Sequence, residues 1–91
     1  MDVTRDRRLR ALARDGDALA QFRLGMAYLH GDKPRRALRW LQESSNAGHP
    51  QAALALGRIF LSGAASSPDP AQALVMFERA ATAGSAQGCY E

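Results

Sequence analysis

Cysteine, Val, Ile and long apolar runs are scarce in this chain of 91 residues, and each shortage excludes a class of protein. The single cysteine, Cys89, excludes an internal disulfide framework and suits a reducing compartment. Val and Ile together number three, and no run alternates between apolar and polar residues, so no strand is predicted. No apolar run reaches the roughly 18 residues of a membrane-spanning helix, and MDVTRDRRLR at the N-terminus lacks the apolar segment of a signal peptide. We therefore expect a helical protein without a membrane span, located in the cytoplasm, or in the periplasm or outside the cell if a leader has been removed.

Small apolar residues and an uneven charge distribution dominate what is present. Apolar residues make up 46% of the chain, and many of them are Ala, which favours helices and lets them pack closely. The formal net charge is +3. Residues 1–40 hold ten Lys or Arg against five Asp, whereas residues 41–91 hold two Arg against four acidic residues. The positive charge is therefore concentrated in the N-terminal half.

Glycines mark an internal repeat. When Gly16 is aligned with Gly48, residues 16–31 (GDALAQFRLGMAYLHG) match residues 48–63 (GHPQAALALGRIFLSG) without a gap. Counting back from the next glycine aligns residues 37–48 with residues 73–84 in the same way. The repeat intervals are 32 and 36 residues, because the connectors DKPRR and AASSPDPAQ differ in length. A period near 34 residues with two helical patterns per unit predicts a solenoid of helix–turn–helix repeats.

Capping residues predict where the helices begin and end. The first helix of each unit should follow an N-cap residue and stop at a left-handed glycine, which gives the pairs Asp17 and Gly31, then His49 and Gly63. The second helix should begin at a proline and end at a glycine, which gives Pro34 and Gly48, then Pro70 and Gly84. Residues 3–14 resemble a preceding second helix, and Ser85 should cap the start of a third unit.

A single all-α domain over residues 1–91 follows from this register. We predict a right-handed superhelix of antiparallel helix pairs, with five helices and a C-terminal helical fragment. Its parts are a basic capping helix, two repeats and the start of a third, over residues 1–15, 16–47, 48–83 and 84–91.

The recurring positions resemble the Sel1-like repeat, a branch of the tetratricopeptide superfamily. The first unit carries the resemblance at Ala18, Ala20, Phe22, Leu24, Gly25, Tyr28, Gly31, Ala37, Trp40 and Gly48. The second unit carries it at Ala52, Leu54, Leu56, Gly57, Phe60, Gly63, Asp69, Ala73, Ala80, Ala81 and Gly84. The chain departs from the pattern where Ser44 and Ser45 replace an Ala pair and Met76 replaces a Trp. The resemblance implies an adaptor surface for proteins or peptides and no catalytic residue.

A glycine inside each first helix needs a compensating contact. Gly25 and Gly57 occupy the same slot of the two units, although a mid-helix glycine costs about 1 kcal/mol relative to Ala. We expect the neighbouring helix to approach closely at both positions.

Catalytic, metal and cofactor sites are not indicated by any motif. Neither a GxGxxG nor a GxxxxGK[ST] phosphate loop is present. His30, His49 and Cys89 fit no spacing of metal ligands, and the serines show no nucleophile-elbow context. We expect a protein that is not an enzyme and uses no cofactor.

Candidate binding residues lie on the first helices, which by analogy with tetratricopeptide arrays line the concave face. These positions are Leu19, Arg23, Met26, Ala27 and His30, followed by Gln51, Ala55, Arg58 and Ile59. Arg23 and Arg58 are the charged candidates for a peptide carboxylate. The expected partner is therefore a protein or peptide.

Two further surfaces leave alternatives open. The N-terminal arginines form a candidate basic patch of Arg5, Arg7, Arg8, Arg10 and Arg14. This patch suits a solvated capping helix or an acidic protein partner. Nucleic acid or a membrane surface has less support, because no nucleic-acid motif is present. At the other end, Leu74, Phe77 and Ala81 should be partly uncovered, which makes a homodimer, or membership in a longer repeat array, the alternative to partner binding.

Overall fold

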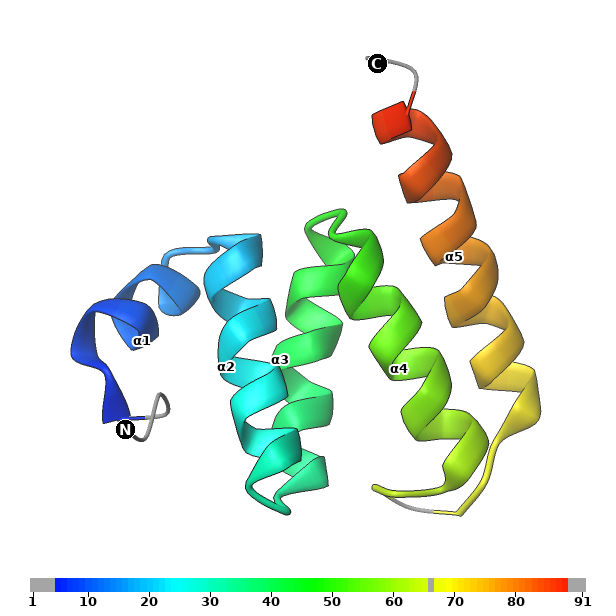
Figure 1. Cartoon of the computed structure of the whole chain (residues 1–91), viewed down its shortest axis with the longest axis horizontal. Helices are drawn as coiled ribbons and strands as arrows, with labels where there is room; N and C mark the ends of the chain where they lie inside the picture. The colour runs from blue at the N-terminus through cyan, green and yellow to red at the C-terminus, as the bar shows by residue number, and fades with distance from the viewer. Residues whose placement is uncertain (1–4, 66, 89–91) are drawn as a thin grey trace.

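Five helices follow one another in the computed structural model, which describes residues 5–65 and 67–88, with side chains through residue 84. They are α1 (Arg7–Arg14), α2 (Ala18–His30), α3 (Pro34–Asn46), α4 (Pro50–Ser62) and α5 (Pro70–Gly88), and the described residues contain no strand (Figure 1). Each helix packs against the next one in the chain. This arrangement confirms the predicted all-α fold.

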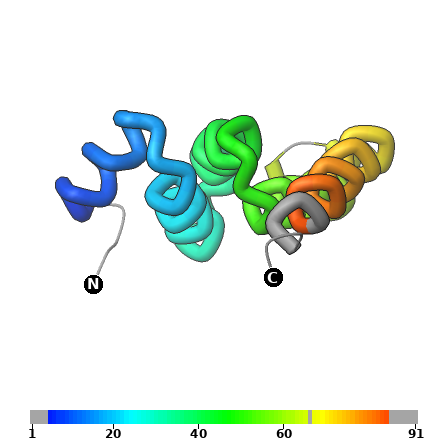
Figure 2. The backbone as a smooth tube through the Cα atoms, turned by 90° about the horizontal axis from the view of Figure 1, so that it is seen from above, coloured from blue at the N-terminus to red at the C-terminus, as the bar shows by residue number. Residues whose placement is uncertain are grey.

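The helices form a slab of two layers. The molecule measures 36 × 32 × 19 Å, and its shortest dimension fits two helices of about 10 Å each. Viewed along the slab, α2 and α4 lie toward one side of the row and α3 lies toward the other, while α5 slants from the side of α3 toward that of α4 (Figure 2). The first helices of the two repeats therefore share one face.

Aspartate side chains begin three of the helices. The Asp17 carboxylate accepts a hydrogen bond from the Ala20 amide at 2.9 Å, and the Asp69 carboxylate accepts one from the Gln72 amide at 3.1 Å, as predicted. The start predicted for the first helix was wrong. The Asp6 carboxylate accepts hydrogen bonds from the amides of Arg8 and Leu9, at 2.9 and 3.2 Å, so α1 begins at Arg7 and not at residue 3.

The two connectors reverse the chain differently. Gly63 has a φ of 75° and ends α4 as predicted. Gly31 does not take the predicted left-handed conformation, because its φ is −85° and the next residue, Asp32, has a φ of 61° instead. The amide of Lys33 donates to the carbonyl of Tyr28 at 2.9 Å, so the short connector reverses one residue later than the glycine. Asp is one of the few residues that tolerate this conformation.

Helix α5 continues through Gly84, which contradicts its predicted end there and the predicted N-cap role of Ser85. Gly48 ends α3 with a φ of 93° and is followed by His49 and Pro50. A proline disfavours helical backbone in the residue before it, so the chain must leave the helix at that point. No proline follows Gly84, and the helix runs on to Gly88. The third unit predicted from residue 84 is therefore not separated from α5, and residues 89–91 lie outside the described part.

Leucines at equivalent places form the core. Leu24, Leu41 and Leu56 are fully buried. One cluster surrounds Leu24 between α1 and α2, and a second surrounds Leu41 and Leu56 between α3, α4 and α5. Tyr28 packs against both clusters and therefore connects them.

Both mid-helix glycines allow the predicted close approach. A Cβ on Gly25 would lie 2.8 Å from Leu41 Cγ, and one on Gly57 would lie 2.5 Å from Phe77 Cε1. Carbon atoms do not approach this closely without displacement. The glycines therefore set the spacing between α2 and α3 and between α4 and α5.

Buried polar side chains add connections that the sequence did not reveal. Gln21 Nε2 donates to the Ala13 carbonyl at 2.9 Å and joins α2 to the end of α1. Ser44 Oγ donates to the Ala18 carbonyl at 2.7 Å and joins α3 to the start of α2. The serine that replaces the expected alanine at position 44 thus helps to hold α2 in place.

Candidate functional site

Three adjoining hollows lie on the face formed by α2 and α4, and together they make up what we call the α2–α4 groove. The hollow between α1 and α2 has a volume of about 410 Å³ and is lined by Asp6, Leu9, Phe22, Arg23, Met26, Ala27 and His30. The central hollow, of about 260 Å³, is lined by Phe22, Met26, Gln51, Leu54, Ala55 and Arg58. The third, of about 270 Å³, is lined by Met26, Leu29, Ala55, Arg58, Ile59, Ser62 and Ala64. Met26 lines all three, so the hollows adjoin one another at this side chain.

Helical spacing explains why these residues meet. Residues three, four or seven positions apart share one face of a helix, and Arg23, Met26 and His30 follow this spacing on α2. On α4 the same rule places Gln51 and Arg58 on one face. Gly25 packs against α3 and Gly57 packs against α5, so the sides of α2 and α4 that carry these residues are left uncovered.

Apolar side chains form the floor of the groove, and positively charged side chains lie at its edges. Ala55 and Ile59 are buried and Met26 is half-buried, whereas Arg23 and Arg58 are exposed. Within the described part of the chain, no ion pair occupies either guanidinium. The nearest acidic lining residue, Asp6, uses its carboxylate to cap α1. Two cationic groups therefore remain available beside an apolar surface.

The structure brings most, but not all, of the predicted candidates together. Met26, Gln51 and Arg58 share the central hollow, and Arg23 and His30 share the hollow nearer α1 with Met26. Leu19 is 50% exposed and lines none of the three hollows.

Several lining residues are not among the predicted ones, and two of these share a helix face with predicted residues. Phe22 was assigned to the repeat pattern alone, although it lies four residues before Met26 and therefore on the same face of α2. Leu54 is 38% exposed and lies four residues before Arg58. The helical spacing that selected the arginines would also have found these two apolar positions.

His49 lies next to the groove at the start of α4. Its ring contacts the ring of Phe22 edge-to-face, with centroids 4.7 Å apart and planes at 83°. Burial lowers the pKa of His49 from its ordinary value of 6.5, because desolvation disfavours the charged form. The side chain makes no hydrogen bond to the first turn of α4, so its predicted N-cap position carries no side-chain cap.

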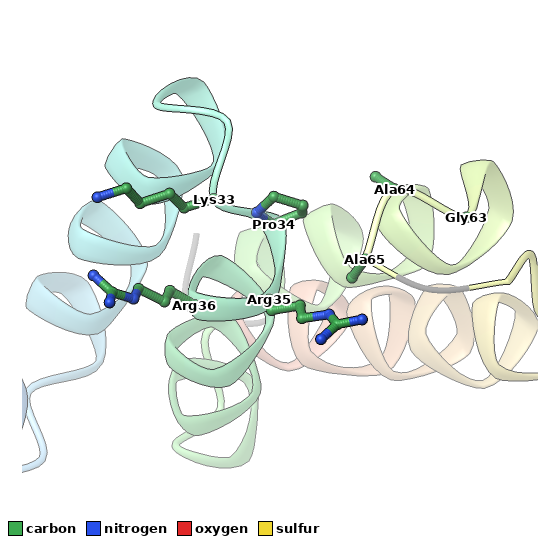
Figure 3. A pocket seen from close by; sticks show the side chains of 7 residues that line it. All are labelled: Lys33, Pro34, Arg35, Arg36, Gly63, Ala64 and Ala65. Carbon is green, nitrogen blue, oxygen red and sulfur yellow. The ribbon is translucent and has the colours of Figure 1, made fainter.

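Cations also surround two hollows away from the groove. One, of about 540 Å³, lies between the start of α3 and the connector after α4 and is lined by Lys33, Arg35 and Arg36. Figure 3 shows Arg35 extending toward this connector and the other two side chains extending away from it. The other, of about 450 Å³, is lined by Arg10 and Arg14 together with Tyr28, Arg36, Arg39 and Trp40. Of the predicted basic patch, Arg5, Arg7 and Arg8 are exposed and do not line this hollow.

The described residues show neither a metal centre nor a membrane helix. No group of three His, Cys, Asp or Glu side chains among them could hold a metal ion. None of the described helices is both long and apolar enough to cross a bilayer.

The paired helices and the groove define a helical-repeat protein of the tetratricopeptide-like class. A family model described as Sel1 repeat matches residues 18–49 and 50–85, and the chain belongs to this family. The crystal structure of a Sel1 repeat protein from Oxalobacter formigenes is similar, with 36% sequence identity and a TM-score of 0.75. The match covers 85% of this chain and 61% of that protein, so this chain spans less than two thirds of its relative's length. A comparison with curated proteins finds no match.

Membership of the family indicates a class of function. Sel1 repeat proteins are generally protein–protein interaction modules and are typically scaffolds without enzymatic activity. A protein partner is therefore the class of ligand to consider for the groove.

Proposed function

We propose that the chain is an adaptor that binds an extended peptide segment of a partner protein in the α2–α4 groove. The observation that supports this best is that three hollows adjoin at Met26, with Arg23 and Arg58 beside an apolar floor. An apolar peptide side chain on Met26 and Ala55 would be removed from water, which contributes about 25 cal/mol for each Å² buried. Carboxylates of the same peptide would pair with the two guanidinium groups.

A selection of peptides from a random library on the purified chain tests this proposal. Selected peptides should combine an apolar residue with acidic ones, and their affinity should fall about tenfold or more when Arg23 and Arg58 are both replaced by Glu. Met26→Glu should also abolish binding, because a charge would then stand on the apolar floor.

The matched control is the pair Arg7→Glu and Arg8→Glu. It makes the same change in net charge on exposed positions outside the groove. Equal loss of affinity in this control and in the groove variant would contradict the proposal, since attraction would then depend on total charge alone.

Self-association is a second candidate, which the exposed apolar residues of the C-terminal half support. Leu74 is 59% exposed and Leu61 is 56% exposed, and Ala81 is exposed as predicted. Phe77 is half-buried against Gly57, so it contributes less free surface than expected. A second copy covering Leu74 predicts a concentration-dependent mass in light scattering that Leu74→Glu removes. A constant monomer mass at high concentration would eliminate this candidate.

A further inference from the structure

A second hollow lies on the opposite side of α2 from the groove. Successive helical residues are 100° apart, so Tyr28 points about 200° away from Met26 around the helix axis. The hollow next to Tyr28 has a volume of about 450 Å³ and is built by three helices. We call it the arginine hollow, and its lining residues are Arg10, Arg14, Tyr28, Arg36, Arg39 and Trp40.

Helical spacing turns the cations of α1 and α3 toward the same space. Arg10 and Arg14 are four residues apart on α1, and Arg36 and Arg39 are three apart on α3. Four like charges around one hollow repel one another unless an anion neutralises them. Among the residues that the structure describes, none forms an ion pair with any of the four. The described residues thus gather positive charge here, and none of them pairs with it.

Aromatic side chains make the hollow a shaped site. The guanidinium carbon of Arg36 lies 5.9 Å from the centroid of the Tyr28 ring, which is within the range of a cation–π interaction. Trp40 is half-buried and packs against the core cluster around Leu24. In Figure 3, Arg36 extends to the side of α3 opposite to Arg35, although its residue also lines the hollow of about 540 Å³.

We propose that the arginine hollow binds an acidic segment of a partner protein, in a manner independent of the α2–α4 groove. Two or more Asp or Glu carboxylates would pair with the guanidinium groups of α1 and α3, each of which can donate two parallel hydrogen bonds. An apolar side chain of the same segment would contact the exposed part of Trp40. The ligand is thus recognised by clustered carboxylates next to an apolar residue.

The charge pattern favours a short acidic peptide over a nucleic acid. Asp15 directly follows Arg14, and Glu43 lies one turn beyond Arg39 on α3, so both helices change sign at the end of the hollow. A nucleic acid carries a phosphate at every nucleotide and would extend onto these carboxylates. Residues 41–91 also hold four acidic residues against two Arg, which would repel an extended polyanion. The protein-binding character of the family agrees with this choice.

Trp40 allows a direct test because it is the only tryptophan of the chain and it lines the hollow. The probe is a hexaglutamate peptide with blocked ends, titrated into the whole chain while Trp40 fluorescence is recorded. A saturable change is expected, with an affinity that decreases as salt is added. A hexaglutamine peptide of the same length should produce no change.

Paired substitutions separate the hollow from the net charge. Arg10→Gln with Arg14→Gln, and Arg36→Gln with Arg39→Gln, should each weaken hexaglutamate binding about tenfold or more. Arg7→Gln with Arg8→Gln removes the same charge from α1 outside the hollow and should weaken it only about two- to threefold. Circular dichroism establishes that each variant is folded, and a variant that unfolds is replaced by the corresponding Lys pair, which keeps the charge but lacks the guanidinium fork.

Three outcomes would overturn this proposal. If the Arg7 and Arg8 variant weakens hexaglutamate binding as much as the variants of the hollow do, the binding depends on the net charge of the chain alone. Tighter binding of a hexathymidylate than of hexaglutamate would reassign the hollow to nucleic acid. Loss of hexaglutamate binding in an Arg23→Gln and Arg58→Gln variant would place the peptide in the α2–α4 groove. If the library selection yields no peptide that binds the α2–α4 groove, the proposal for the arginine hollow is unaffected.

Discussion

The two repeats have a glycine at the same position but pack different residues against it. In the first repeat Leu41 fills the space over Gly25 and is fully buried, whereas in the second Phe77 fills the space over Gly57 and is only half-buried. The larger side chain is thus the less buried one. The comparison shows that an equivalent position in the repeat does not give an equivalent energetic role, because the α2–α3 contact lies inside the molecule and the α4–α5 contact lies at its edge.

Truncation of the two residues should have the largest effect. Leu41→Ala should lower the free energy of unfolding by about 3 to 5 kcal/mol, since it leaves a cavity between three packed helices. Phe77→Ala removes a larger side chain but should cost only about 2 kcal/mol, because part of the ring already contacts water. Urea denaturation measures both values. A larger loss for Phe77→Ala would reverse the assignment of centre and edge.

Adding a methyl group at the glycines tests the same contrast from the opposite side. Gly25→Ala should cost about 1 to 3 kcal/mol, because the new Cβ meets the fixed Leu41 side chain. Gly57→Ala should cost a similar amount in the native background and much less when it is added to Phe77→Ala, which removes the ring that the new Cβ would meet. Gly84→Ala is the control, since a Cβ there meets nothing within 4 Å, and it should stabilise α5 by up to about 1 kcal/mol. Failure of the double variant to recover stability would show that α5 itself, and not the ring, obstructs the methyl group.

The connectors should respond to substitution with opposite signs. Asp32→Gly should stabilise the first connector by about 0.5 to 1 kcal/mol, because Asp32 has a φ of 61° that glycine adopts without steric cost. Gly63→Ala should destabilise the second by about 1 to 2 kcal/mol, since its φ is 75° and a Cβ would lie 2.7 Å from Pro68 Cδ. Thermal melts of the two single variants measure both changes. The same sign in both would mean that backbone conformation does not distinguish the connectors.

Local patterns in the sequence predicted much of this architecture. The glycine register, the prolines at positions 34 and 70, and the caps at Asp17 and Asp69 each depend on neighbouring residues only, and the structure has the corresponding helix boundaries. The end at Gly84 could not be predicted from glycine alone, because the break at Gly48 also needs the proline that follows.

The α2–α4 groove and the arginine hollow also differ in how far the sequence predicts them. Arg58 and Met26 reach one hollow because helical spacing selects one face of each first helix, and that spacing is visible in the sequence. The arginine hollow joins Arg10 and Arg14 to Arg36 and Arg39, and their meeting depends on how α1 and α3 pack across α2. Tertiary packing of this kind has no local signal, so only the N-terminal half of that cluster was recognised.

The start of the first helix gives the smallest expected difference between the repeats, and it depends on pH. Asp17 caps α2 with its carboxylate, whereas His49 occupies the equivalent position before α4 without a cap and with a lowered pKa caused by burial. The unfolded chain therefore binds a proton at His49 before the folded chain does as the pH falls through 6.5. The free energy of unfolding should be constant above this value with respect to His49, should decrease below it, and should level off once the folded-state pKa is passed. Urea titrations at pH 7.5 and below measure the decrease, and His49→Asn, which does not titrate and is a favoured N-cap residue, should reduce it. His30→Gln is the control because His30 is exposed. If the decrease persists in His49→Asn but vanishes in His30→Gln, then His30 and not His49 causes the pH dependence.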